Sequence, residues 1–210
     1  MPNDILVHVI DDDDAARESL EFLLRSAKFK VRTYPSAMVF LDVLTQAVQS
    51  GCIITDVRMP QITGLELLQR LREKGIGMPV IVITGHGDVP LAVQAMKNGA
   101  VDFLEKPFDD DLLLASVRSA LSAQERDARR DAERAELHDR LATLSNRERE
   151  VLEGLVAGLP NKTIAYNLAI SPRTVEVYRA NVMTKMKAAS LSELVRMALV
   201  AGLLSATNDK

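Results

Sequence analysis

Polar residues of three types stand directly after four strand-like runs in the first half of the chain. They are Asp11 and Asp12 after residues 7–10, Asp56 after 52–55, Thr84 after 80–83 and Lys106 after 101–105. Polar residues commonly end strands, but an acid pair, a third acid, a hydroxyl and an ammonium together are much less expected by chance. Because the carboxyl ends of parallel strands meet at one edge of a sheet, we expect these side chains to share a site.

Phosphoryl transfer is the chemistry that such a set permits. The carboxylate of Asp56 can act as a nucleophile and form an acyl phosphate. The oxygens of the transferring group carry negative charge that a metal and fixed cations stabilise, and clustered carboxylates suit Mg²⁺. We therefore predict that Mg²⁺ binds Asp12 and Asp56, with Asp11 acting through water. Lys106 would contact one phosphoryl oxygen, and the Thr84 hydroxyl would donate a hydrogen bond to another.

The acids after the first run have a simpler explanation, in which they only start a helix. We expect that role for Asp13 and Asp14. Four consecutive acids leave the metal-binding pair ambiguous by one residue, and we choose 11 and 12 because the predicted strand ends at Ile10. His86 follows Thr84 closely but is expected to be solvated and without a chemical role.

Strand-like and helical periodicities alternate through residues 4–124. The predicted strands lie near 5–10, 30–34, 52–55, 79–83 and 101–105. The predicted helices lie near 14–27, 36–48, 64–74, 89–98 and 109–124, with Ser36, Asp88 and Asp109 as candidate N-caps. Five such units predict an α/β fold: a doubly wound, five-stranded parallel sheet of the flavodoxin-like kind.

Charge is distributed unevenly along the 210 residues. The net charge is −3, but residues 1–125 hold 12 basic and 18 acidic side chains, whereas 126–210 hold 14 basic and 11 acidic ones. Within 161–187 five basic residues stand against one acidic residue. This asymmetry predicts two domains with different partners.

Neither a membrane span nor a signal peptide is evident, and hydrophobic residues make up 47% of the chain. The single cysteine, Cys52, lies in an apolar run and is expected to be a buried hydrophobe. These features predict a cytoplasmic protein without a membrane partner.

A charged connector separates the two halves. Residues 124–140 contain 11 charged side chains and neither Gly nor Pro. We expect a solvated helix that frays near its middle, where Arg126 and Arg130 repel each other; a flexible linker is the alternative. The predicted boundaries are therefore a domain at 1–124, a helical linker at 125–142 and a second domain at 143–210.

The second half predicts four helices. A capping box at Ser145 and Glu148 opens the first, which runs to about Ala157. The others are expected near 161–169, 172–187 and 190–202, and the middle two form an all-α helix-turn-helix domain.

A helical wheel divides the predicted helix 172–187 into a core face and an outer face. The core face carries Val175, Tyr178, Val182 and Met186. The outer face and its flanks could read DNA bases or bind phosphates, and with Lys162 the candidate contacts are Arg173, Thr174, Glu176, Val177, Ala180, Asn181, Lys185 and Lys187. Arg179 lies near the edge of the core face, where bracing against Glu148 or Glu150 is as plausible as a DNA contact.

Residues 4–124 resemble the receiver domain of two-component response regulators, with its acid pair, phospho-accepting Asp56, switch Thr84 and Lys106–Pro107. This resemblance implies that the Arg58 backbone carbonyl completes the metal shell and that the Lys106–Pro107 peptide is cis. It also implies that Phe103 turns inward when Thr84 moves toward the phosphate. From the residues alone, Phe103 is equally an ordinary half-buried strand aromatic.

Residues 143–205 resemble the LuxR-type four-helix DNA-binding domain, notably at 144–152 (LSNREREVL) and 171–177 (SPRTVEV). The two resemblances together cover nearly the whole chain and match the NarL/FixJ class. Residues 82–90 (VITGHGDVP) and 159–162 (LPNK) are similar to members that activate nitrogen-fixation genes under oxygen control. Oxygen, nitrogen and a haem-containing kinase rest wholly on this resemblance.

The resemblance implies a phosphorylation-activated transcription regulator, an activator and not an enzyme. A sensor histidine kinase would donate the phosphate, and the phosphorylated protein would pair with itself through residues 89–105. The dimer would then bind promoter DNA, with half-sites about one helical turn apart, and RNA polymerase.

Three other functions fit the residues less well. A phosphatase with an aspartyl-phosphate intermediate usually has a second acid two residues after the nucleophile, where this chain has Arg58. A flavin protein needs a phosphate-binding loop after the first strand, where four aspartates would repel it. A constitutive DNA binder is disfavoured by the complete set of phosphoacceptor residues.

Overall fold

The computed structural model describes residues 6–44, 51–85 and 89–203. By its internal contacts the chain divides into two compact units, Met1–Arg126 and Asp127–Lys210. Each unit has its own apolar core. In the described ranges no helix is both long and apolar enough to cross a membrane.

The first unit is built on five parallel strands in the order β2-β1-β3-β4-β5. The strands are β1 (Leu6–Ile10), β2 (Lys30–Tyr34), β3 (Cys52–Asp56), β4 (Val80–Thr84) and β5 (Asp102–Glu105). All residues of β3 and β4 are buried, as their continuous apolar sequences predict. The strand order reverses between β1 and β3, and the crevice of such a sheet opens at that point, beyond the carboxyl ends.

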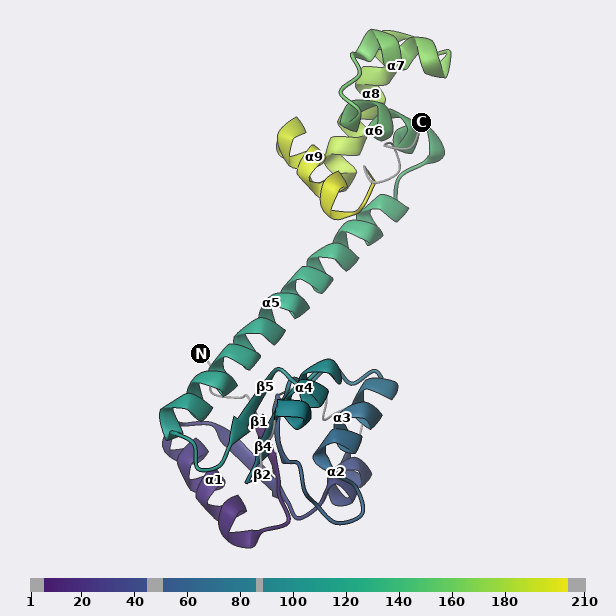
Figure 1. Ribbon diagram of the computed structural model, residues 1–210. Coiled ribbons are helices and arrows are strands. Elements are labelled where there is room, and N and C mark those ends of the chain that lie inside the picture. The colour runs from purple at the N-terminus through teal and green to yellow at the C-terminus, as the bar shows by residue number, and fades with distance from the viewer. Residues whose placement is uncertain (1–5, 45–50, 86–88, 204–210) are drawn as a thin grey trace. The chain divides into compact units, whose positions relative to one another are not determined.

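Helices cover both faces of the sheet (Figure 1). They are α1 (Asp14–Ser26), α2 (Ala37–Val43), α3 (Gly64–Glu73), α4 (Val89–Lys97) and the first turns of α5 (Asp110–Ala142). α1 and α5 share one core with the sheet, and α2, α3 and α4 share the other. The predicted doubly wound fold is confirmed. The second helix was predicted to reach residue 48. The structure ends α2 at Val43, and residues 45–48 lie outside the described residues.

Side-chain caps fix where these helices begin. The Asp13 carboxylate accepts hydrogen bonds from the Ala15 and Ala16 backbone N–H groups, so Asp13 starts α1 as expected. Asp14 opens the helix and forms an ion pair with Arg17. Ser36 caps α2, and Asp109 accepts from the Asp111 N–H at the start of α5, whereas the predicted cap Asp88 lies outside the described residues.

Helix α5 is unbroken over 33 residues and includes the whole charged connector. The fraying expected near residues 126–131 is not observed. Residues 125–136, most of them charged, are all exposed, whereas Leu137 and Leu141 are buried in the core of the second unit. The last turns of α5 therefore belong to the second unit.

The second unit adds α6 (Asn146–Val156), α7 (Asn161–Leu168), α8 (Pro172–Met186) and α9 (Leu191–Val200). The predicted capping box is present: the Ser145 hydroxyl accepts from the Glu148 N–H, and the Glu148 carboxylate accepts from the Ser145 N–H. Between α7 and α8, Ala169 adopts a left-handed conformation with φ 53°. Ser171 then caps α8, which completes the predicted helix-turn-helix.

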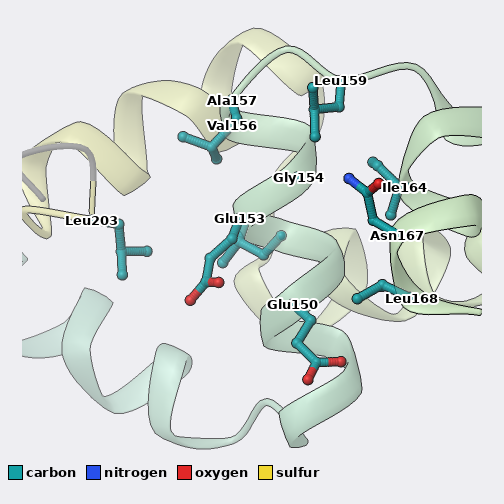
Figure 2. Close-up of a pocket in the computed structure, with 11 residues that line it drawn as sticks. Glu150, Glu153, Gly154, Val156, Ala157, Leu159, Ile164, Asn167, Leu168 and Leu203 are labelled. Carbon is teal, nitrogen blue, oxygen red and sulfur yellow. The ribbon is translucent and has the colours of Figure 1, made fainter. Parts of the chain in front are cut away.

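A groove of about 540 Å³ in this unit is lined mainly by residues of α6 and α7. Figure 2 shows the side chains that line it. Gly154 permits the close approach of these helices, since a Cβ at this position would lie 2.8 Å from Cγ1 of Ile164. Glu150 and Glu153 lie at the edge of the groove, and Leu203 also lines it. Among the described residues, the lining of the groove includes none of the candidate DNA contacts.

Candidate phosphorylation site and nucleic-acid interface

The strand ends place the predicted acidic, hydroxyl and ammonium groups at one edge of the sheet. Asp11 directly follows β1, Asp56 and Thr84 are the last residues of β3 and β4, and Lys106 directly follows β5. The parallel register pairs Asp56 with Ile83, which aligns the ends of the central strands. Four separate segments therefore meet where the topology places the crevice.

Lys106 joins the two buried carboxylates. Its Nζ lies 2.8 Å from Oδ2 of Asp11 and 3.0 Å from Oδ1 of Asp56. Asp11 is 1% exposed and Asp56 is 8% exposed. Lys106 lies 95 positions from Asp11 and 50 positions from Asp56 in the sequence, so these two contacts bring together three predicted site residues that are far apart in the chain.

Backbone N–H groups hold the remaining carboxylate oxygens. The Arg58 N–H donates to Oδ2 of Asp56 at 2.6 Å, and the Asp13 N–H donates to Oδ1 of Asp11 at 3.0 Å. Hydrogen bonds to charged acceptors are strong and directional. The Asp56 carboxylate is therefore held in one orientation at the mouth of the crevice.

The ammonium of Lys106 stays charged in this environment. Burial acts to lower the pKa of Lys106, but hydrogen bonds and charge interactions with Asp11 and Asp56 outweigh it, and the pKa is raised above its ordinary value. A fixed positive charge therefore lies within hydrogen-bonding distance of the candidate nucleophile.

The predicted metal ligands are only partly assembled. Asp12 is exposed beside the buried Asp11, and in the described part of the chain no three His, Cys, Asp or Glu side chains form a metal-binding cluster. The residues nevertheless fit a divalent ion, because two buried carboxylates share a single ammonium and retain a net negative charge. Asp56 and the acid pair of Asp11 and Asp12 would hold such an ion, and Lys106 already brings Asp11 and Asp56 together.

Thr84 ends β4, Phe103 lies in β5, and the Lys106–Pro107 peptide follows β5. Thr84 is buried, and its backbone carbonyl accepts from the Lys106 N–H at 2.7 Å. Phe103 is half-buried and packs against the core formed by α2, α3 and α4. The Lys106–Pro107 peptide is cis, as the resemblance implies.

Gly64 is a site residue that the sequence analysis missed. A Cβ there would lie 2.2 Å from the backbone oxygen of Asp56, a separation that atoms cannot adopt. The Gly64 N–H also donates to the Val57 carbonyl at 3.0 Å. The start of α3 thus packs directly against the backbone of Asp56, and only glycine can occupy this position. In the sequence, Gly64 appeared only as the start of a helix.

The outer face of α8 presents the predicted DNA-contacting residues. Val175, Val182 and Met186 are buried and Tyr178 is half-buried, which confirms the predicted core face. The exposed candidates are Arg173, Glu176, Val177, Ala180, Asn181, Lys185 and Lys187 on and beside α8, and Lys162 on α7. Val177 is 57% exposed, so its side chain is accessible on this face.

Two of the predicted contacts have internal roles. The Thr174 hydroxyl lies 2.8 Å from the Ser171 hydroxyl at the start of α8. The Lys185 ammonium donates to the Glu148 carboxylate at 2.6 Å and to the Thr143 carbonyl at 3.2 Å. Lys185 therefore braces α8 against α6, and its predicted phosphate contact stays a prediction.

Of the two alternatives left open for Arg179, a brace to Glu148 or Glu150 and a DNA contact, the brace is not observed among the described residues. Glu148 is paired with Lys185, and Glu150 is paired with Arg147 at 2.9 Å. The pairing of Lys185 with Glu148 was not predicted, because the sequence shows only that Lys185 is basic and lies on α8. An exposed aromatic, Tyr166, was also missed; it lies one helical turn after Lys162 on α7.

The Glu148–Lys185 pair predicts a pH dependence in the second unit. Hydrogen bonds from Lys185 and from the Ser145 N–H lower the pKa of Glu148 to about 2. A lowered carboxyl pKa contributes stability above the ordinary value of 4.5, and this contribution is lost as the pH falls toward 2. We expect Glu148→Gln to be less stable than wild type at pH 7, with the difference shrinking through this range. Urea titrations followed by the α8 amide signals in NMR would measure it.

Glu153→Gln is the matched control, because Glu153 is an exposed carboxylate on the same helix. The difference between this variant and wild type should not depend on pH in the same way. An unchanged pH profile in Glu148→Gln would contradict the assignment of the brace.

Comparison with known proteins identifies the class of molecule to which this fold and site belong. The chain belongs to the response regulators that combine a receiver with a LuxR-type DNA-binding domain. Residues 7–118 match the response regulator receiver domain, and residues 142–198 match the luxR family of bacterial regulatory proteins.

The relatives narrow this class to FixJ-like transcription regulators. The chain is 63% identical over 206 residues to the transcriptional regulatory protein FixJ of Azorhizobium caulinodans, covering 98% of this chain and 97% of that protein. It is 54% identical to FixJ of Rhizobium meliloti, covering 95% and 97%. A crystal structure of full-length FixJ from B. japonicum is 55% identical, with a TM-score of 0.60 and coverage of 96% and 99%. The response regulator StyR is 41% identical, with a TM-score of 0.79 and coverage of 92% and 98%.

Proposed function

We propose that this chain accepts a phosphoryl group on Asp56 from a sensor histidine kinase and then activates transcription as a DNA-bound dimer. The observation that carries this proposal is the contact of Lys106 with both Asp11 and Asp56 at the carboxyl edge of the sheet. The similarity to FixJ proteins supports nitrogen-fixation genes as the targets and RNA polymerase as a further partner.

In the phosphoryl transfer, an Asp56 carboxylate oxygen attacks phosphorus. The new oxygen–phosphorus bond forms as the bond to the donor breaks, and the donor atom leaves with the electron pair. The Arg58 N–H holds the other carboxylate oxygen, and Lys106 is within reach to donate to a phosphoryl oxygen. The buried Thr84 ends the neighbouring strand and is the hydroxyl proposed to hold a second phosphoryl oxygen.

Mg²⁺ is the proposed cofactor, held by Asp11 and Asp56 with the Arg58 carbonyl, and with Asp12 at the exposed side. When bound, it would offset the negative charge of the carboxylates and of the phosphoryl oxygens. Phosphorylation is then proposed to draw Thr84 toward the phosphate and to turn Phe103 inward from its half-buried position. Both movements would alter the surface formed by α4 and β5.

That surface is the proposed dimer interface. Large apolar side chains are exposed along it: Val89 (77%), Val93 (46%) and Met96 (49%) on α4, and Val101 (46%) before β5. An exposed apolar strip of this kind is typical of a surface that binds a partner. Two paired receivers would present two DNA-binding domains to half-sites about one helical turn apart.

On DNA, α8 is the proposed recognition helix. Glu176, Val177, Ala180 and Asn181 are proposed to meet base edges, and Arg173, Lys187 and Lys162 to meet phosphates. Thr174 would contribute through the N-terminal turn of α8. The proposed domain boundaries are 1–124 and 143–210. Between them α5 has an exposed part, residues 125–136, followed by turns that pack on the second unit.

A stable acyl-phosphate mimic tests this function directly. We expect beryllofluoride with Mg²⁺ to shift full-length protein from monomer to dimer in sedimentation experiments and to tighten its binding to specific DNA. The physical reason is that the mimic favours only the receiver state that pairs. Unchanged sedimentation and unchanged DNA affinity would contradict the proposed function.

A further inference from the structure

The last turns of α5 are built into the DNA-binding unit. Leu137 is 4% exposed and Leu141 is 5% exposed, and both belong to the core that contains Val182 and Met186 of α8. Apolar burial of this extent fixes the end of α5 against α6 and α8. The segment 136–142 is therefore more than a connection between domains.

Arg140, between these leucines, binds the end of the recognition helix. Its Nη1 donates to the Met186 backbone carbonyl at 3.0 Å, and its Nη2 donates to the Glu136 carboxylate at 2.6 Å. Met186 is the last residue of α8, where carbonyl groups lack partners within the helix and the dipole is negative. A guanidinium is suited to this position, since it carries a permanent charge and can donate in two directions.

Two further side chains join the same segments. The Lys185 ammonium donates to the Thr143 carbonyl, and Arg149 Nη2 donates to the Leu141 carbonyl at 3.1 Å. The C-terminal end of α8 is thus held at three places: by Arg140 of α5, by Thr143 just after α5, and by Glu148 of α6. The proposed base-contacting residues lie earlier on the same helix, so its orientation depends on this anchor.

We propose that Arg140 is a positioning residue for DNA recognition, which fixes the C-terminal end of α8 to the last turn of α5. The inference rests on the proposed function, because it assumes that α8 enters the major groove. Base contacts require correct distances and angles, whereas phosphate contacts tolerate small displacements. Loss of the anchor should therefore weaken specific binding more than non-specific binding.

The test compares Arg140→Ala, Arg140→Lys and Arg129→Ala in the full-length protein with the wild type. Arg129 is the matched control, since it is an exposed arginine on the same helix. The probes are a DNA fragment that the beryllofluoride-activated wild type selects from a random pool and an unselected fragment of equal length. We expect Arg140→Ala to lose roughly tenfold in affinity for the selected fragment, comparable to disturbed recognition of one base pair, with little change for the other.

Arg140→Lys covers the case in which the alanine variant unfolds. Lysine keeps the charge and most of the stem, but a single ammonium cannot reproduce the two-direction contact, so we expect an intermediate loss of about threefold. Equal losses for both fragments in the folded variants would show a merely structural role and overturn the proposal, as would ratios equal to wild type. If the activated wild type selects no sequence from the random pool, the proposed function is contradicted, which is a different outcome from failure of the Arg140 proposal.

Discussion

Replacing Asp56 with Asn is expected to abolish covalent phosphorylation of the protein. The side-chain amide that results is a poor nucleophile. Asp11 is the other carboxylate that Lys106 contacts among the described residues, and it is more deeply buried than Asp56. The variant should gain no phosphoryl mass after incubation with acetyl phosphate and Mg²⁺. It should also fail to dimerise in response to beryllofluoride.

Asp14→Asn provides a matched control for this loss. Asp14 is an exposed acid at the start of α1, and its side chain forms an ion pair with Arg17 on the same helix. This variant should be phosphorylated at the rate of wild type. Persistent phosphorylation of Asp56→Asn would mean that another residue accepts the phosphate.

Lys106→Met is expected to give the second large effect, on both phosphorylation and stability. Removal of the ammonium takes away a fixed positive charge at the reacting group, for which losses of about 10²–10³-fold in rate are typical. It also leaves the buried carboxylates of Asp11 and Asp56 without their shared partner, which should destabilise the receiver by on the order of 3 kcal/mol. Rates of phosphorylation and urea unfolding curves would measure the two effects.

Mg²⁺ supplies a distinctive check on the Lys106 variant. If Asp11 and Asp56 bind the ion, Mg²⁺ should recover much of the lost stability, since it supplies the missing positive charge. It should not restore the rate to the same extent. Lys97→Met, which removes an exposed lysine of α4, should show neither effect. A stability loss that Mg²⁺ leaves unchanged would contradict the proposed metal ligands.

The sheet and the site edge could be predicted because each depends on local patterns. Continuous apolar runs are typical of strands buried on both faces, and a parallel sheet brings their carboxyl ends together. Asp56, Thr84 and Lys106 could therefore be placed from the sequence before any contact was known. The Ser145–Glu148 capping box and the buried face of α8 were predictable for the same reason.

The features that were missed depend on tertiary contacts. The role of Gly64 arises from the path of β3 above it, and the pairing of Lys185 arises from the position of Glu148 on another helix. The continuity of α5 through residues 126–131 was also not predicted. Weak repulsion between like charges one turn apart is a small effect, and burial of Leu137 and Leu141 anchors the end of the helix.

The central claim is that four strand ends form a site that stores a phosphoryl group on residue 56. Tandem mass spectrometry of the wild-type protein, after incubation with acetyl phosphate in the presence or absence of Mg²⁺, tests it most directly. The account predicts one added phosphoryl group, formed only with the divalent ion and located on the peptide that contains Asp56. A phosphoryl group on any other residue, or none at all in the presence of Mg²⁺, would contradict it.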